Sequence, residues 1–305
     1  MHRFVLGFIA LFLTLPSPAA AQEKIARPRI TGIHHVRIYV SDMAKSRAFY
    51  SGIVGFPTDD SHCVGLSRFC IELSPVQHVE LEQAPSPAPD NWLAEISFAT
   101  EDVPELRAYL VAKGLNPGPI SEDASHTRTR HFELYDPEGH LVSFARDYGV
   151  HSFRGNAISD AVSSRIIHAG FVVKDRALMD HFYKDILGFR TYWHGGFKDA
   201  DTDWYELQVP DGDEWIEYML NISPTADKKE LGIQDHFSLG VRDIHAADSK
   251  FLTKGTATYD APEIGRDGKW SLDLYDPDGT RVELMEFNPV EKPCCSEYTG
   301  PHPKP

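Results

Sequence analysis

The sequence predicts an α+β fold with two related halves, each a curved open barrel built from tandem βαβββ units. Three observations predict it. A long pattern of residues occurs twice, each copy alternates strand-like with short helix-like segments, and several strand-like segments carry a polar residue between apolar neighbours. A curved sheet covered outside by helices accounts for all three, because its inner face gives those polar residues a place to meet.

Two matches define the repeat. Residues 40–56 match residues 173–189, and the Tyr-Asp-Pro-Glu-Gly turn at 135–139 matches Tyr-Asp-Pro-Asp-Gly at 275–279. The first offset is 133 residues and the second is 140. The second copy therefore has about seven extra residues, which we place near the polar segment 194–203.

The first residues have the parts of a secretory signal. His2 and Arg3 precede an apolar run that ends at Leu15, and three alanines precede Gln22. The run is shorter than the roughly 20 residues that cross a bilayer. We therefore expect an exported protein, periplasmic or secreted, with no membrane partner once the signal is cleaved. The predicted organisation is a signal peptide at 1–21, a leader at 22–30, an N-terminal domain at 31–150, a linker at 151–164, a C-terminal domain at 165–290 and a Pro-rich tail at 291–305.

Each predicted unit begins with a strand that runs into a capped helix. Alternating apolar residues predict the strands, Asp or Ser begins each helix, and glycine ends it. In the first copy these elements are a strand at 33–40, a helix at 44–54, a strand at 94–100 and a helix at 103–113. The second copy repeats them, with a helix at 244–254, and its last strand follows the turn at 276–279.

The charge and the cysteines narrow the function. Lys+Arg 30 against Asp+Glu 45 gives a net charge of -15, which disfavours nucleic acid and anionic lipid and leaves a small molecule as the expected partner. The four cysteines fit structural disulfides in an oxidising compartment. Cys63 can pair with Cys70 across a hairpin. Cys294 and Cys295 lie in the tail, which they can instead tie to the first domain, and the sequence leaves that connectivity open.

Polar residues stand at matched strand positions in the two copies. The matched pairs, first copy then second, are His35 and His168, Glu80 and Glu217, Glu95 and His236, and Ser143 and Glu283. Only the second copy keeps two histidines with two carboxylates. The plain interpretation of a lone histidine is a hydrogen-bonded strand residue. Two imidazoles and a carboxylate on rigid strands instead favour a divalent transition metal with open positions for a substrate.

These motifs resemble the vicinal oxygen chelate superfamily, which includes glyoxalase I and the extradiol ring-cleavage dioxygenases. The resemblance rests on the strand Ile-His-His-Val at 33–36, the Phe-Tyr…Gly-Phe segments at 49–56 and 182–189, Asp235-His236, and Val-Glu-Leu at 282–284. It implies paired βαβββ units around a divalent metal, Fe(II) preferred and Mn, Zn or Ni as alternatives. The ligands carry over to His168, His236 and Glu283. If the units pair across copies, as in glyoxalase-like arrangements, His35 and Glu80 replace His168.

The resemblance implies a metal-dependent enzyme for a small substrate that chelates through oxygen, with ring-cleavage dioxygenase chemistry preferred. The alternatives are a glyoxalase-type lyase or isomerase and a non-catalytic binding or resistance protein. The chain departs from the extradiol pattern, because Asp273 stands where a tyrosine is usual and residues 262–270 hold no histidine. His194 and Tyr205 are the candidate proton donors in their place. The sequence leaves substrate, metal and oligomeric state open, a homo-oligomer included.

Overall fold

A computed structural model describes residues 26–55, 63, 68–123, 128–149, 161–254 and 259–305. The predicted signal peptide, 1–21, and residues 151–160 of the predicted linker lie outside the described residues. Within the described ranges, no helix combines the length and apolar character that a membrane span needs.

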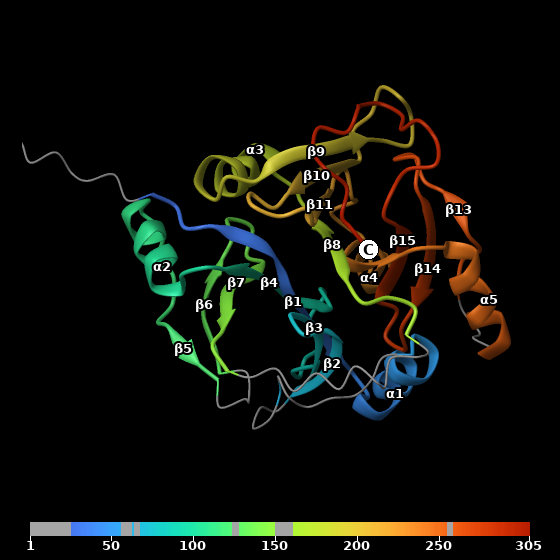
Figure 1. The fold of residues 1–305 in the computed structure, drawn as a ribbon, viewed down its shortest axis with the longest axis horizontal. Helices are drawn as coiled ribbons and strands as arrows, with labels where there is room; N and C mark the ends of the chain where they lie inside the picture. The colour runs from blue at the N-terminus through green and yellow to red at the C-terminus, as the bar shows by residue number, and fades with distance from the viewer. Residues whose placement is uncertain (1–25, 56–62, 64–67, 124–127, 150–160, 255–258) are drawn as a thin grey trace, which may run out of the picture.

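Two curved mixed sheets, one from each copy, form the framework of the described chain (Figure 1). The first sheet contains, in spatial order, β2 (Arg68–Ser74), β3 (Gln77–Gln83), β1 (Ile30–Val40), β4 (Leu93–Thr100), β7 (Leu141–Asp147), β6 (Thr129–Tyr135) and β5 (Ser121–Glu122). The second contains β13 (Glu263–Ile264), β14 (Trp270–Tyr275), β15 (Arg281–Glu286), β12 (His236–Val241), β8 (Ile166–Val172), β11 (Trp215–Met219), β10 (Trp204–Gln208) and β9 (Arg190–Gly195). The predicted class, α+β with two open barrels of βαβββ units, is confirmed.

The helices begin at aspartate caps, which the sequence predicts for all but the helix that follows Asp227. Asp42, Asp102, Asp175 and Asp227 each accept a hydrogen bond from a backbone amide of the first helical turn. The helices are α1 (Met43–Arg47), α2 (Val103–Ala112), α3 (Arg176–Asp180), α4 (Lys228–Gln234) and α5 (Ile244–Lys254), and π-helical turns at Ala48–Ile53 and His181–Ile186 continue α1 and α3.

The units pair within each copy and not across copies. In the second sheet β8 lies between β12, antiparallel, and β11, parallel, while β15 pairs with the other edge of β12. The first sheet repeats this arrangement with β1 between β4 and β3, and with β7 beside β4. Each copy therefore has its own inner face, which bears His168 in the second copy and His35 in the first.

One hydrophobic core joins the outer faces of both sheets. Phe98 of the first copy meets Phe189 of the second edge to face, with ring centroids 5.3 Å apart. The Tyr109 hydroxyl of α2 donates a hydrogen bond of 2.7 Å to the carbonyl of Ile186. Because helices of each copy pack into this shared core, the two inner faces look away from it.

The Pro-rich tail packs on the second copy. Tyr192 of β9 contacts His302 through Oη and Nδ1, 2.6 Å apart, and Gln208 of β10 donates to the carbonyl of Pro301. Two disulfides are present in the described chain. The first joins Cys63 to Cys70, one of the predicted pairings, and the second joins Cys294 to Cys295. The tail is therefore not tied to the first copy by a disulfide, and polar contacts hold it to the second.

Candidate metal centre

Four neighbouring strands bring the polar residues of the second copy together. His168 lies on β8, Glu217 on β11, His236 on β12 and Glu283 on β15, and all four side chains are buried. The Nε2 atoms of the two histidines are 3.1 Å apart. Glu283 Oε2 is 3.0 Å from Nε2 of His168 and 3.9 Å from Nε2 of His236, and Glu217 Oε2 is 3.5 Å from the latter.

Backbone features set the orientation of His236. A Cβ atom added at Gly170, which pairs with His236, would lie 2.1 Å from the imidazole Cε1, so only glycine leaves room for the ring. His236 Nδ1 lies 2.8 Å from the carbonyl of Gln234, to which it donates. A proton held on Nδ1 leaves the lone pair on Nε2, which Arg281 Nη2, His168 Nε2 and Glu283 Oε2 approach to 2.9, 3.1 and 3.9 Å.

The separations fit a bound divalent metal ion. With metal–ligand bonds of about 2.0–2.2 Å, adjacent ligand atoms in a tetrahedral or octahedral shell lie about 3 Å apart. The pairs His168–His236 and His168–Glu283, at 3.1 and 3.0 Å, have that spacing. His168, His236 and Glu283, the predicted ligands, therefore meet at one point, and Glu217 stands beside them as a carboxylate that the predicted set omitted.

Burial sets the charge state of the centre. It lowers the pKa of both His168 and His236, with the positive charge of Arg281 adding to the effect, so both rings are neutral. Burial raises the pKa of Glu283, and burial together with Glu283 raises the pKa of Glu217 to about 8. A divalent cation bound here would favour the ionised form of the two carboxyl groups, and the two neutral imidazoles could bind it through nitrogen.

Two cations, neither of them in the predicted site, lie on the same inner face. Nη2 of Arg281 is 2.9 Å from both ring nitrogens of His236, and Nη1 is 3.4 Å from Asp273. Lys269 is fully buried, and its Nζ lies 4.2 Å from the ring centroid of Trp215. The sequence does indicate Arg281, because it lies two residues before Glu283 on β15 and so shares its face of the sheet. No local pattern identifies Lys269, because the tail residue Tyr298 helps to enclose it.

His194 and Tyr205, the predicted proton donors, do not reach this centre. Tyr205 pairs with Tyr218 and stacks on its ring, on the face of the sheet opposite Glu217. Arg176 of α3 lies 3.6 Å above the ring of Tyr205, which stacks against His194 in turn. The strand alternation places both residues on the outer, helix-covered face, so their prediction as donors at the metal centre is not supported.

The first copy fills the corresponding place differently. In the second copy Gly170 pairs with His236. In the first copy the equivalent residues are Arg37 and Glu95, which pair in the same register. Arg37 Nε donates to Glu80 over 3.0 Å, and its Nη2 contacts Glu95. His35 belongs to this sheet, so the alternative ligand set of His35 and Glu80 with His236 and Glu283 is not assembled.

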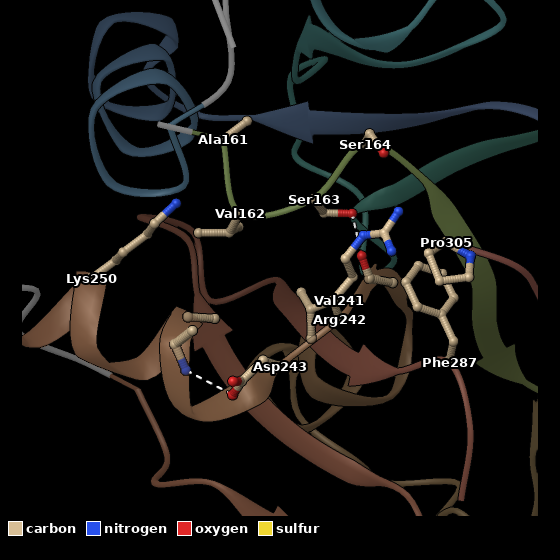
Figure 2. Close-up of a pocket in the computed structure, with 13 residues that line it drawn as sticks. Ala161, Val162, Ser163, Ser164, Val241, Arg242, Asp243, Lys250, Phe287 and Pro305 are labelled. Atoms are coloured by element: carbon tan, nitrogen blue, oxygen red, sulfur yellow. Dashed lines mark hydrogen bonds between the residues drawn. The ribbon is translucent and has the colours of Figure 1, made fainter. Parts of the chain in front are cut away.

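A separate cavity of about 300 Å³ lies where the end of the linker meets α5 and the tail (Figure 2). Ser163 donates to the carbonyl of Gly240 at its edge, and Arg242, Lys250 and Phe287 also line it. No histidine or cysteine is among the described residues that line it.

A family model described as the Glyoxalase/Bleomycin resistance protein/Dioxygenase superfamily matches residues 32–144 and 165–284. No curated protein sequence matches the chain.

Solved structures of similar fold include homoprotocatechuate 2,3-dioxygenases. A variant from B. fuscum is 19% identical with a TM-score of 0.66 and covers 88% of this chain and 73% of its own. The substrate complex from Brevibacterium fuscum with 3,4-dihydroxyphenylacetate is 19% identical with a TM-score of 0.62, covering 89% and 83%. The enzyme from Arthrobacter globiformis is 19% identical with a TM-score of 0.64, covering 88% and 84%. At this identity the likeness shows the fold alone.

Proposed function

Because the chain belongs to the Glyoxalase/Bleomycin resistance protein/Dioxygenase superfamily, we propose that its second copy is a divalent-metal-dependent enzyme for a small substrate that chelates through two oxygen atoms. Ring-cleavage dioxygenase chemistry is the preferred reaction, and Fe(II) is the preferred metal, with Mn, Zn and Ni as alternatives. One observation carries the proposal: His168, His236 and Glu283 meet with separations that fit a coordination shell, while their counterparts in the first copy do not.

When bound, the metal would act as a Lewis acid and a template for substrate oxygens. The residues of the chain have separate roles around it. Arg281 and Lys269 supply positive charge on the inner face and so favour an anionic substrate oxygen. The Trp215 ring, stacked on His168 at 4.8 Å, holds that imidazole in place and gives the site an aromatic wall. The tail residue Tyr298, which donates to the carbonyl of Asp267, limits the entry of water.

A specific observation supports a second reaction, isomerisation or lysis of glyoxalase type. Glu217 lies 3.5 Å from Nε2 of His236, beside the place where a substrate would be held. A carboxylate there could take a proton from a carbon of the substrate as a general base and return it as a general acid. A non-catalytic binding protein remains the alternative of another class, and a measured absence of turnover would favour it.

We also propose that the mature protein is exported, to the periplasm or beyond, and that its partner is a small molecule. The N-terminal signal and the two disulfides support export. The net charge of -15 supports a small molecule over nucleic acid.

The experiment is anaerobic reconstitution with Fe(II), followed by oxygen consumption across catechols, hydroquinones and 2-oxo acids. We expect His236→Ala to abolish oxygen consumption and His181→Ala, an exposed histidine on the outer surface, to retain it. Oxygen consumption that survives His236→Ala overturns the proposal. Proton exchange or isomerisation without oxygen uptake, lost in Glu217→Gln, would assign the second reaction instead.

A further inference from the structure

Three histidines gather on the inner face of the first copy, and two of them, His34 and His78, stand where the second copy has Ile167 and Trp215. His34, His35 and His78, named here the three-histidine cluster, are all buried. A β-bulge between Ile33 and His35 interrupts the pairing of β1 with β4. Because a bulge re-aims side chains that would otherwise alternate between faces, two consecutive histidines reach the same place.

The nitrogens of this cluster converge. His34 Nδ1 and His35 Nδ1 are 2.9 Å apart, and one nitrogen from each of the three rings lies within 4.8 Å of the other two. The rings of His35 and His78 are stacked with centroids 4.8 Å apart, and that of His34 meets both edge on. A distance of 2.9 Å is about the spacing of two nitrogens that share one ion through bonds of about 2.0–2.1 Å.

Carboxylates orient the histidines from outside, as is usual around a metal. Asp147 Oδ1 lies 3.2 Å from Nε2 of His34 and also accepts a hydrogen bond from Thr129. Glu80 Oε1 lies 3.4 Å from Nε2 of His78. The distal nitrogens of His34 and His78 therefore face carboxylates, an arrangement that sets the tautomer of each ring and directs the other nitrogen elsewhere.

The space between these groups suits a single ion. A cavity of about 10 Å³ is lined by all three histidines, by the acidic residues Glu80, Glu95 and Asp123, and by Arg37 and Arg68. That volume is of the order that holds one water molecule. Nε2 of His35 is buried without a hydrogen-bond partner among the described residues, 3.8 Å from Glu80 and 3.7 Å from Glu95.

We propose that the first copy holds a second transition-metal site, with His34, His35 and His78 as ligands and Glu80 as the outer carboxylate that faces His78. Imidazole nitrogens suit Zn²⁺, Ni²⁺ or Cu²⁺. This site differs from the centre of the second copy, because Arg37 occupies the place of Gly170 and His78 that of Trp215. The assignment is independent of the function proposed for the second copy.

The test uses the full chain carrying His236→Ala, which lacks the second-copy centre. Purified protein is loaded with Zn²⁺, dialysed and analysed for bound metal, and its thermal midpoint is recorded with and without the ion. We expect one equivalent of zinc to remain and the midpoint to rise. Adding His78→Phe, which keeps an aromatic ring in the stack, or His34→Gln should each lower bound zinc at least tenfold, whereas His181→Gln should change nothing.

Two results overturn this assignment. One is less than a tenth of an equivalent of zinc on His236→Ala, and the other is a full equivalent that survives both His78→Phe and His34→Gln. Circular dichroism confirms that each variant is folded before loading. A wild-type protein that binds one equivalent, lost in His236→Ala, would support the second-copy centre and reject the three-histidine site. One equivalent of zinc that is lost only in the His34 and His78 variants would support the three-histidine site and count against the second-copy centre.

Discussion

The hydroxyl of Tyr50 in the first copy donates a hydrogen bond of 3.2 Å to the Asp276 carboxylate of the second copy. The repeat mirrors this contact, because Tyr183 donates to Asp136 over 3.3 Å in the opposite direction. Each aspartate begins the Asp-Pro turn of its copy and also accepts from the amides of that turn. The same two sequence motifs therefore form both the turns and the contact between copies.

Loss of one of these hydroxyls should weaken the protein. Tyr50→Phe removes a buried hydrogen bond to a charged group, which we expect to cost about 1.5–3 kcal/mol of unfolding free energy, as measured by urea denaturation. Tyr135→Phe is the matched control, because that side chain is 69% exposed, and it should change stability by less than about 0.5 kcal/mol. Equal effects of the two variants would contradict the role given to Tyr50.

Asp276 should make stability depend on pH. Burial raises the pKa of its carboxyl from 3.8 to about 6, although the amides of Thr280 and Asp278 act in the other direction. Because this carboxyl has a higher pKa in the folded protein than in the unfolded chain, its contribution to stability is complete below the pKa of the unfolded chain. That contribution is lost as pH rises through the pKa of the folded protein. Over the whole transition, from below pH 3.8 to above pH 6, this loss amounts to about 3 kcal/mol.

Asp276→Asn should lack that loss while keeping the acceptor oxygen of the turn. We expect the unfolding free energy of Asp276→Asn, relative to wild type, to rise by about 2 kcal/mol between pH 4 and pH 7. Denaturation curves recorded across that range measure the difference directly. A difference that stays constant with pH would show that the carboxyl of Asp276 has an ordinary pKa.

Gly170 should control the metal affinity of the second copy. A Cβ atom there would lie 2.1 Å from Cε1 of His236, so Gly170→Ala must displace the imidazole. We expect the affinity for Fe(II) or Zn(II) at the second-copy centre to fall about 10–100-fold, the range seen when a ligand loses its support. Gly52→Ala is the control, since its Cβ meets nothing within 4 Å. Unchanged affinity in Gly170→Ala would remove His236 from the ligand set.

Arg37 should be required for the stability of the first copy. Arg37→Met leaves the buried carboxylates Glu80 and Glu95 without their shared cation, and we expect a loss of about 3–5 kcal/mol in urea denaturation. Adding Glu95→Gln should restore a large part of it. Arg29→Met removes an ion pair whose side chains are more than half exposed, so it should cost at most about 1 kcal/mol. A mild effect of Arg37→Met would contradict a buried ion pair.

Much of the fold could be predicted from local pattern. Helix α5 has the predicted bounds, Ile244–Lys254, and β4 begins one residue before the predicted strand. Caps and alternation identify such elements because both depend on residues close in sequence. The proton donors were less predictable. His194 and Tyr205 are paired across β9 and β10, and strand alternation turns both to the outer face, away from Glu217.

By itself, the sequence determined the two copies, their α+β class and the matched positions at which polar residues replace one another. It did so because repeats, turns and periodicity are local properties of the chain. Only the tertiary structure decided that units pair within a copy, which brings His168 to His236 and Glu283 and separates His35 from them. It alone also placed Arg37 between Glu80 and Glu95 and brought His34, His35 and His78 together. Strand order and register set these contacts, and they depend on residues far apart in sequence.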